Sequence, residues 1–427
     1  MVISRSGIVV GTTAVMLTAV AVVGAGIHLS SQASFRESPK DLIDEVWQII
    51  DKNYVDGTFN QVDWKAVRNE YLSRDYTTEE QAYDAIREML EKLEDPYTRF
   101  MDPEEFKNMQ IDTSGELTGV GIQLTQDEES KKLIVISPIE DSPAFDAGVQ
   151  AQDIITKIDG KSTQGMDINE AVKLIRGPIG TQVIITIKRG NQEIDYPITR
   201  DQIEIHPVRS AKKESPQGNI GYIRLNTFSA NASEEMEEAI EDLEQQNVTG
   251  YILDLRSNPG GLLFSSIDIA RMWLEQGDIV STVDRRGEQD RQRADNRALT
   301  DAPLVVLVDG GSASASEILS GALQDNERAV LVGTKTFGKG LVQSVRELGN
   351  GSGLAVTIAK YFTPSGRDIN HEGIQPDVNV ELTEQQREDL RKDRSKIGTP
   401  EDPQYAKALE ILLKQVAAKE NQQATSQ

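Results

Sequence analysis

Residues 303–326 read PLVVLVDGGSASASEILSGALQDN and join three kinds of local structure. PLVVLVD is a continuous apolar run, typical of a strand that is buried on both faces of a sheet. SEILSGALQDN carries its apolar residues at helical spacing. Small residues fill the turn between them. The stretch therefore predicts a buried strand that ends at Asp309, a tight turn, and a helix that begins near Ser314–Ser316.

The sequence around this stretch alternates in the same way between strands and helices. GYIRLNTF, GYILDLRSN and AVLVGTK read as strands, and SANASEEMEEAIEDLEQQNV and LLFSSIDIARMWLEQG read as helices. Alternating strands and helices are typical of a layered α/β fold. We therefore expect residues 202–397 to form an α/β core.

The rest of the chain has a different character. Residues 113–201 hold short β-rich runs with turn residues between them and two helical pieces, which predicts a compact module. Residues 34–112 contain DLIDEVWQIIDKNYV and TTEEQAYDAIREMLEKL, whose apolar residues repeat at helical spacing. Residues 398–427 predict a helical tail through QYAKALEILLKQVAAK.

The composition excludes several classes of function. The 427 residues carry a net charge of −24, which argues against a nucleic-acid partner, whose phosphates attract Lys and Arg. The sequence has no cysteine, so disulfides, thiolate nucleophiles and sulfur-ligated metals are excluded. Hydrophobic residues make up 38% of the chain, which is enough for packed cores.

An apolar segment opens the chain. Residues 7–29 are largely apolar and follow Arg5, a pattern typical of an export signal or a membrane anchor. Ser31 and Ala33 are small residues at the right spacing for cleavage after Ala33. Cleavage would remove residues 1–33, and retention would leave an anchor. In both cases we expect the bulk of the chain to lie outside the cytoplasm.

Three serines in the central turn, Ser312, Ser314 and Ser316, are candidates for a nucleophile. A serine here would lie at the end of a buried strand and beside a helix N-terminus, whose N–H groups and dipole favour an oxyanion. A structural role competes with this one, because Ser314 and Glu317 fit a capping box. The residues alone leave open both the role and the choice among the three.

A serine nucleophile needs a base, and the chain has only three histidines. His28 lies in the apolar opening segment, and neither His206 nor His371 sits in a recognisable motif. A histidine base stays open, because a Ser-His-Asp arrangement is defined by geometry and not by chain order.

A lysine is the other candidate base. In water its pKa of about 10.4 keeps it protonated, but burial lowers the pKa of a lysine. In TFGKGLVQSV, Lys339 stands between two glycines, and Gln343 follows four residues later. Gln343 could orient the amine without protonating it, although LVQSV reads as a strand, which would separate the two side chains. Lys335 competes, in a sequence typical of an exposed loop.

Two glycine-containing turns are candidate binding elements. In DLRSNPGGLL, Gly260 and Gly261 follow a strand and suit either half of an oxyanion hole or an ordinary turn. In LTGVGIQL, Gly119 and Gly121 precede a strand, in a loop suited either to a peptide carboxylate or to a hairpin corner.

Taken together, these motifs resemble those of the carboxyl-terminal processing proteases, the tail-specific serine peptidases of bacteria and photosynthetic organelles. The motifs are TGVGI, SPAFDAGV, DLRSNPGGLL, SASASEILSGALQDN, GTKTFGKGLVQSV and GSGLAVTIAKYFTPSGRDI. Each is weak alone, and together they are specific over nearly the whole chain. The resemblance implies a crotonase/Clp-protease-like α/β peptidase core at 202–397, an inserted PDZ domain at 113–201 and a helical N-terminal region.

The resemblance also assigns roles to residues. It implies Ser314 as the nucleophile, Lys339 as the general base and Gln343 as the residue that orients the lysine. It implies oxyanion donors at the backbone N–H of Ala315 and of Gly260 or Gly261. A PDZ loop that binds the substrate C-terminus or gates the site would comprise Thr118, Gly119, Val120, Gly121 and Ile122. The family needs no metal or cofactor.

The resulting hypothesis is an exported serine endopeptidase that cleaves proteins near their C-termini. Its partners would be proteins or peptides with accessible C-termini and, in a homo-oligomer, copies of itself. It would lie in a bacterial periplasm or a thylakoid lumen, soluble or anchored through residues 7–29. Three alternatives stay open: a non-catalytic PDZ adaptor, a histidine-dependent hydrolase and a crotonase-type acyl-thioester enzyme.

Overall fold

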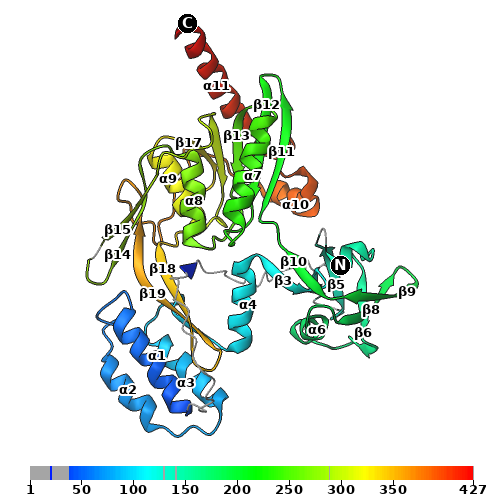
Figure 1. Cartoon of the computed structure of the whole chain (residues 1–427), viewed down its shortest axis with the longest axis vertical. Coiled ribbons are helices and arrows are strands. Elements are labelled where there is room, and N and C mark those ends of the chain that lie inside the picture. The colour runs from blue at the N-terminus through cyan, green and yellow to red at the C-terminus, as the bar shows by residue number, and fades with distance from the viewer. Residues whose placement is uncertain (1–19, 22–37, 128–129, 140–141, 288, 427) are drawn as a thin grey trace, which may run out of the picture. The chain divides into compact units, whose positions relative to one another are not determined.

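The computed structural model describes residues 20–21 and 38–426, apart from residues 128–129, 140–141 and 288 (Figure 1). The described chain divides into two compact units. The core unit comprises the residues up to 106, residues 208–228 and the residues from 236 onward. The inserted unit comprises residues 107–207 and 229–235.

Three helices open the core unit: α1 (Pro39–Asn53), α2 (Trp64–Ser73) and α3 (Glu79–Glu91). Ser38 caps α1 and Thr78 caps α3 through their hydroxyls. Each helix buries an apolar stripe, and the three stripes meet in one cluster that also takes in Leu354 and Val356. The expected helical N-terminal region is therefore confirmed.

A six-stranded sheet forms the centre of the core unit. In space its strands follow the order β11 (Val208–Ser215), β12 (Gly218–Leu225), β13 (Val248–Asp254), β16 (Leu304–Val308), β17 (Ala329–Gly333) and β20 (Val378–Asn379). β11 is antiparallel to β12, and the other neighbours are parallel. Every residue of β16 is buried, as the apolar run predicts.

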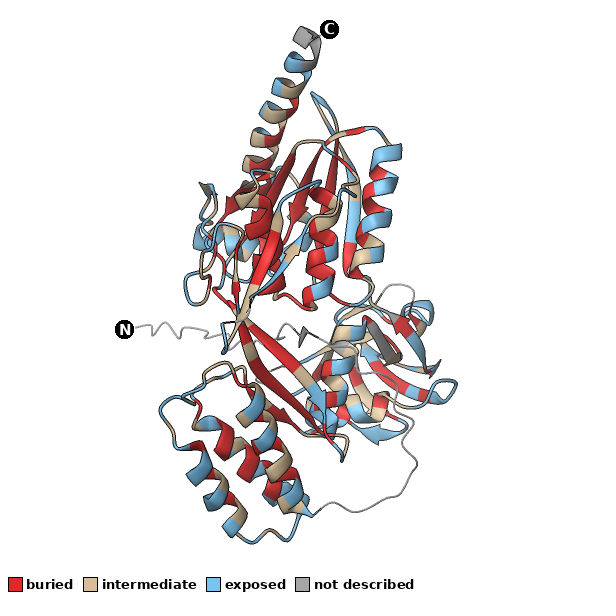
Figure 2. Cartoon of the chain, turned by 60° about the vertical axis from the view of Figure 1, so that its left-hand side comes forward, coloured by how far each residue is buried: buried red, intermediate tan, exposed pale blue. Residues whose placement is uncertain are grey.

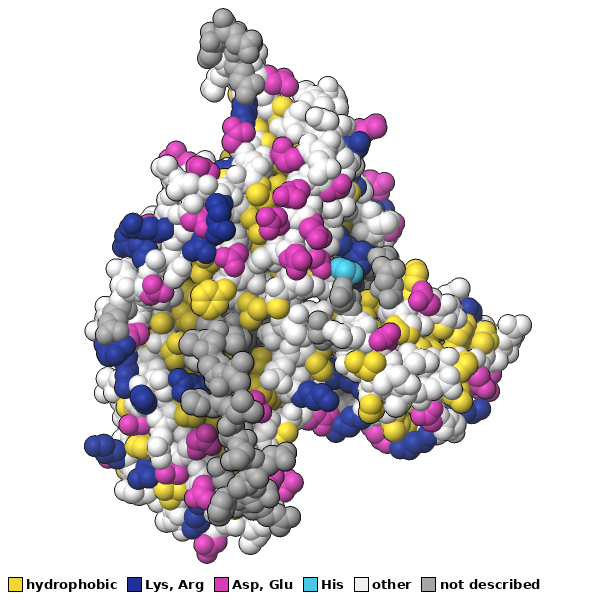
Figure 3. All heavy atoms as spheres, viewed as in Figure 1, with side chains coloured by type: hydrophobic (Ala, Val, Ile, Leu, Met, Phe, Trp, Pro, Cys, Tyr) yellow, Lys and Arg dark blue, Asp and Glu magenta, His cyan; other side chains and the backbone are white. Residues whose placement is uncertain are grey.

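Helices cover both faces of this main sheet, which confirms the α/β fold (Figure 2). On one face lie α7 (Ala232–Gln245), α8 (Leu263–Trp273) and α9 (Ala315–Asp325), and α11 (Pro403–Ser426) packs on the other. Neighbouring residues of β13 point to opposite faces of the main sheet. The ring of Tyr251 lies 5.2 Å from that of Trp273 on α8, whereas Ile252 packs with Leu412 on α11. Acidic side chains gather over α7 on the face shown in Figure 3.

A second sheet of the core unit joins strands from distant parts of the sequence. β18 (Leu341–Glu347) pairs with β19 (Gly353–Phe362), β19 pairs with β14 (Asp278–Asp284), and β14 pairs with β15 (Gln289–Arg293). β2 (Arg99–Met101) adds to β19 in antiparallel orientation. β1 (Val20–Ala21) pairs with β18. The helix α10 (Glu384–Lys392) and a short 3₁₀ turn (Arg394–Lys396) precede α11.

The inserted unit is rich in short strands. The unit begins within α4 (Pro103–Ser114). β3 (Glu116–Gly119), near the start of the unit, pairs with β10 (Asp201–Glu204), near the end of its main stretch. The other strands follow the spatial order β4 (Ile122–Gln126), β5 (Leu133–Pro138), β6 (Ile154–Ile158), β8 (Gln182–Arg189) and β9 (Gln192–Thr199), with β7 (Lys161–Ser162) paired to β6. Two helices, α5 (Pro143–Asp146) and α6 (Ile168–Ile175), complete it.

No helix in the described part of the chain is long and apolar enough to cross a membrane. The expected signal or anchor at 1–33 lies outside the described residues, apart from Val20–Ala21.

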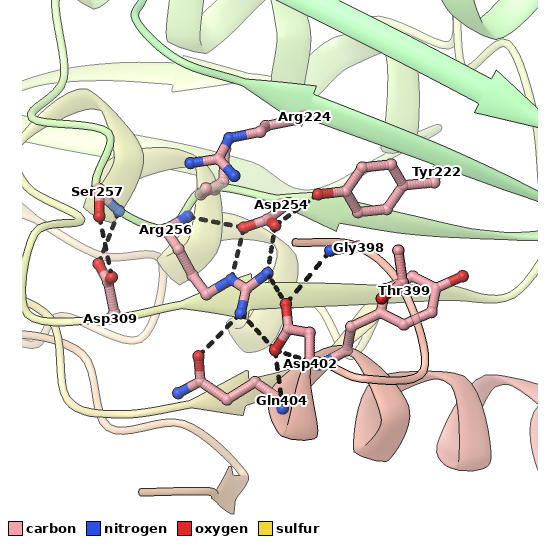
Figure 4. A network of polar contacts seen from close by, with 12 residues as sticks. Tyr222, Arg224, Asp254, Arg256, Ser257, Asp309, Gly398, Thr399, Asp402 and Gln404 are labelled. Carbon is pink, nitrogen blue, oxygen red and sulfur yellow. Dashed lines mark hydrogen bonds and ion pairs between the residues drawn. The ribbon is translucent and has the colours of Figure 1, made fainter. Parts of the chain in front are cut away.

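A buried ion network fastens α11 to the main sheet (Figure 4). Nη2 of Arg256 lies 2.6 Å from Oδ2 of Asp254 and 2.7 Å from Oδ2 of Asp402. Tyr222 donates a hydrogen bond to Asp254, and Gln404 accepts one from Arg256. Both aspartates are fully buried, so Arg256 compensates two charges that have no access to water. The network fixes the end of β13, from which the Pro-Gly-Gly turn leaves.

Replacing Arg256 by Ala should lower the free energy of unfolding by about 3–5 kcal/mol, because two buried carboxylates then lack a cation. Urea denaturation followed by circular dichroism measures this loss. Lys414→Ala is a matched control on α11, since its ion pair with Glu410 is exposed and should matter little. Equal stability losses in the two variants would contradict the assignment of the network.

Candidate active site

The turn between β16 and α9 distinguishes the three candidate serines. The Ser312 hydroxyl donates to the carbonyl of Leu255 at 2.8 Å, and the Ser316 hydroxyl donates to the carbonyl of Asn258 at 2.9 Å. The Ser314 hydroxyl is fully buried and makes no hydrogen bond in the described part of the chain. Only the middle serine therefore has a hydroxyl that the fold does not use.

The backbone of Ser314 adopts an unusual conformation, with φ 54° and ψ −110°. A positive φ costs a residue other than glycine about 1–3 kcal/mol, and such residues cluster at functional sites. The capping box expected at this position forms only in part. Glu317 accepts a hydrogen bond from the Ser314 N–H at 2.8 Å, but the Ser314 hydroxyl makes no cap in return. The Ser314 hydroxyl itself makes no hydrogen bond in the described chain, so it is available for another role.

Glu317 connects two segments: the serine turn, residues 309–314 between β16 and α9, and the lysine loop, residues 334–340 between β17 and β18. Its Oε2 accepts from the N–H groups of Ser314 and Lys339, each at 2.8 Å, so these two nitrogens are no more than twice that distance apart. Its Oε1 accepts from the Thr336 hydroxyl at 2.6 Å and from the Gly338 N–H at 2.7 Å. Burial raises the pKa of the Glu317 carboxyl, although these four hydrogen bonds favour its charged form.

Lys339 is a buried lysine, and no carboxylate of the described residues forms an ion pair with it. Its side chain is 3% exposed, and its Nζ has no hydrogen-bond partner among the described residues. The amine lies 4.8 Å from the ring centroid of Tyr97. Burial, and secondly the charge of Arg99, lower the pKa of Lys339 to about 7. The site therefore favours the uncharged amine far more than water does.

Gln343 lies on β18, as the strand-like sequence LVQSV predicts. Its side chain is fully buried, and Nε2 makes one long hydrogen bond, 3.5 Å, to Oγ1 of Thr357. Its Oε1 has no partner among the described residues. The pairing with β19 shifts register between Val342 and Gln343, and such irregularities re-aim side chains beside active sites.

The Pro-Gly-Gly turn lies against the serine turn. A methyl group on Gly260 would stand 3.1 Å from Cβ of Ser314, and its φ of +106° also favours glycine. The Gly260 N–H donates to the Asn258 side chain at 2.9 Å. Among the described residues, the N–H groups of Gly261 and Ala315 have no acceptor. Of the three expected oxyanion donors, the structure thus leaves two unengaged.

The competing bases lie elsewhere. His206 belongs to the inserted unit, where its Nδ1 is 2.9 Å from a carboxylate oxygen of Glu235. His371 has an exposed side chain, and only its backbone N–H contacts the lysine loop, at the carbonyl of Gly338. Lys335 is exposed. The Nδ1 atom of His206 is thus engaged by a carboxylate, and the side chain of His371 is exposed.

One part of the site escaped the sequence analysis. Residues 95–99, DPYTR, read as a turn-rich junction after the N-terminal helices. In the structure Tyr97 covers the amine of Lys339. No spacing or composition signals this contact, because it arises only from the pairing of β2 with β19.

The candidate carboxylate loop, residues 118–122, lies in the inserted unit. Thr118 and Gly119 end β3, Val120 is buried, and Ile122 begins β4. Gly121 has φ +79°, and a methyl group there would stand 2.2 Å from Cβ of Ser142, so only glycine fits. A methyl group on Gly119 would stand 3.9 Å from Cγ of Arg176, whose guanidinium donates a hydrogen bond to Asn108.

Three separate stretches of the chain match known families. Residues 219–380 match peptidase family S41, residues 134–189 match the PDZ domain, and residues 35–91 match the tricorn protease C1 domain. These stretches correspond to the main and second sheets, to strands of the inserted unit and to the N-terminal helices.

Known proteins are similar over most of the chain. The carboxyl-terminal-processing protease of Synechocystis sp. is 46% identical over 400 residues, which cover 92% of this chain and 92% of that protein. The chloroplastic carboxyl-terminal-processing peptidase 2 of Arabidopsis thaliana is 43% identical, over 78% of this chain and 67% of that protein. The solved structure of a photosystem II D1 C-terminal processing protease is 37% identical, with a TM-score of 0.57, over 86% of this chain and all of that one.

Proposed function

Because this chain belongs to the carboxyl-terminal-processing proteases of peptidase family S41, which are serine-type peptidases with a PDZ domain, we propose that Ser314 is its nucleophile and Lys339 its general base. One observation carries this proposal. The buried side-chain atoms without a hydrogen-bond partner in the described chain include Ser314 Oγ, Lys339 Nζ and Gln343 Oε1. A fold tolerates such a costly group where function needs it. Ser314 lies at the N-cap of α9, Lys339 lies in the loop before β18 and Gln343 lies on β18, and Glu317 joins the first two through their backbone N–H groups.

The first half of the reaction forms an acyl-enzyme. The neutral amine of Lys339 accepts the proton of the Ser314 hydroxyl as Oγ attacks the scissile carbonyl carbon. The negative charge that develops on the carbonyl oxygen is stabilised by the N–H group of Ala315 at the N-terminus of α9 and by the N–H group of Gly261 in the Pro-Gly-Gly turn. When the C–N bond breaks, the ammonium of Lys339 returns the proton to the leaving nitrogen.

The second half hydrolyses the ester. Lys339, again neutral, takes a proton from a water molecule that attacks the acyl carbon, and returns it to Ser314 as the C–O bond breaks. Gln343 Oε1 would accept a hydrogen bond from the lysine in each step and so hold it toward the serine. Neither Ser314 Oγ nor Lys339 Nζ has a hydrogen-bond partner in the described chain, so substrate binding must bring the two together, because catalytic hydrogen bonds often form only in the complex.

The pH dependence of kcat/KM tests the base directly. We expect kcat/KM to rise through pH values near 7 and to level off above, because the lysine pKa of about 7 sets the fraction of neutral amine. Below this value the rate should fall about tenfold per pH unit. Cleavage of a peptide without titratable side chains, measured from about pH 5 to about pH 9, gives the profile. A flat profile across this range would contradict a titrating lysine.

The substrates we propose are proteins with accessible C-termini, which the loop at 118–122 would hold by their terminal carboxylate. A time course with an unstructured protein, read by mass spectrometry, tests this. Fragments cut near the C-terminus are expected from a substrate with a free terminal carboxylate, and slower cleavage from its C-terminal amide. Binding of both without cleavage would instead indicate the PDZ adaptor.

We also propose that the protein is exported, with residues 7–29 as its signal or anchor. Several relatives, including the chloroplastic enzyme above, support a location outside the compartment of synthesis. Mass spectrometry of the protein from fractionated producing cells identifies its N-terminus and compartment. An intact N-terminus in the cytoplasmic fraction would refute export.

A further inference from the structure

We propose that residues 95–99 form one wall of the Lys339 site, and that Asp95, Tyr97 and Arg99 are positioning residues that set how readily the Lys339 amine gives up its proton. This inference rests on the proposed role of Lys339 as the base. It extends the active site into the N-terminal region, in a stretch that contributes no group to the bond-making steps.

The wall is fixed to the second sheet, which carries Gln343 on β18 and receives the lysine loop at the start of that strand. Arg99 begins β2 and pairs with Ala355 of β19. The Thr98 hydroxyl accepts a hydrogen bond from the Thr357 N–H at 3.0 Å and is itself buried. Thr357 is also the register partner of Gln343 on β18. The wall therefore cannot move freely with respect to the lysine, and its groups act from defined positions.

Tyr97 supplies the surface of the wall. Its ring centroid lies 4.8 Å from Nζ of Lys339, where it occupies space that water would otherwise fill. Burial, and secondly Asp95, raise the pKa of the Tyr97 hydroxyl, so the ring stays uncharged at neutral pH. A ring face attracts an ammonium by about 0.5–2 kcal/mol, whereas desolvation shifts a buried lysine by up to several pKa units. The exclusion of water is thus the larger effect.

Two charges of opposite sign stand four residues apart in this wall. Arg99 disfavours a second cation at Lys339, whereas Asp95 favours it. From the other side, Glu317 on α9 also favours the ammonium, although its oxygens are engaged by four donors. Asp95 is held in place because it accepts from the Tyr97 N–H at 3.0 Å and from the Thr98 hydroxyl at 2.7 Å. Burial, Arg99, Asp95 and Glu317 together determine the charge of the lysine.

Charge-removing variants should move the acid limb of the kcat/KM profile in opposite directions. Arg99→Gln removes a like charge, so the limb should shift to higher pH by about 0.5–1 unit. Asp95→Asn removes an attractive charge, so the limb should shift to lower pH by a similar amount. Tyr97→Ala admits water and should shift it to higher pH, whereas Tyr97→Phe keeps the ring and should leave it in place. Arg99→Lys keeps the positive charge and should therefore keep the parent kcat/KM profile.

A merely structural wall would change rates without these signed shifts. The inference would be overturned if the acid limbs of the kcat/KM profiles of Arg99→Gln and Asp95→Asn coincided, or if both shifted in the same direction along the pH axis. The catalytic role of Lys339 would still stand. An active Lys339→Ala variant would instead remove the proposed function itself. A variant too slow to profile is titrated through the ¹³Cε resonance of Lys339, and the same signed shifts decide the outcome.

Discussion

Ser314→Ala and Lys339→Ala should each lower kcat/KM for peptide cleavage by at least about 10⁴-fold, because each removes one half of a unit that acts together. The double variant should be hardly slower than either single variant, since the second loss has nothing left to disable. Cleavage of an unstructured protein, followed by mass spectrometry, measures all three against the parent protein.

The fold should survive these changes. The Ser314 hydroxyl makes no hydrogen bond in the described chain, so its removal leaves no partner without a bond. The Lys339 pKa is lowered from 10.5 to about 7, so above pH 7 the unfolded chain binds this proton and the folded protein largely does not. Burial of the lysine therefore lowers the stability of the folded protein below pH 10.5. This cost shrinks as the pH rises from about 7 to 10.5 and is largest below about 7, and Lys339→Ala removes it.

Neighbouring residues provide matched controls. Lys335→Ala should retain full activity, because Lys335 is exposed on the same loop. His206→Ala and His371→Ala should also cleave at the parent rate, which separates the dyad from a histidine-dependent hydrolase. Full activity of purified Lys339→Ala would falsify the dyad. Acyl-thioester turnover by the parent protein without peptide cleavage would favour a crotonase-type enzyme instead.

Glu317→Gln should lower kcat/KM by about 10²-fold or more while it leaves Ser314 and Lys339 chemically intact. The carboxylate accepts from four donors, two on each oxygen. An amide offers one oxygen, and its NH₂ group would face the other two donors. Each buried donor left without an acceptor costs about 1–3 kcal/mol, so the serine turn or the lysine loop must move. A displacement of the order of 1 Å is enough for a 10²-fold loss.

The loss should appear mainly in kcat, because Glu317 is buried and positions the reacting groups without touching the substrate. A lower melting temperature should accompany it. Glu327→Gln, an exposed change just after the same helix, should alter neither quantity. Parent-like kcat for Glu317→Gln would show that the two loops hold their positions without the carboxylate.

Much of this arrangement can be predicted from the sequence because local patterns carry it. The buried strand, the tight turn and the helix of residues 303–326 follow from apolar periodicity and small residues, and β16 and α9 confirm them. The capping pattern identified the Glu317 contact to the Ser314 backbone, but it left open whether the serine hydroxyl caps the helix or acts as a nucleophile. Cap propensity cannot reveal that Ser314 adopts a positive φ or that its hydroxyl makes no hydrogen bond in the described chain.

The rest of the site depends on contacts between distant segments. Gly260 and Gly261 look equivalent in sequence, but the side chain of Asn258 engages the N–H of the first alone. Tyr97 reaches Lys339 across more than half of the chain through strand pairing that no local pattern specifies. Family resemblance selected Ser314, Lys339 and Gln343, whereas only the tertiary structure relates the lysine to the groups that determine its charge.

Direct titration of Lys339 tests the account most stringently. The protein is labelled with ¹³Cε-lysine, and the resonance of Lys339 is identified by its absence from the spectrum of Lys339→Met. We predict that this resonance titrates with a pKa of about 7, far below the other lysines. A midpoint near 10.5, the ordinary lysine value, would show a protonated amine at neutral pH and would contradict its role as the base.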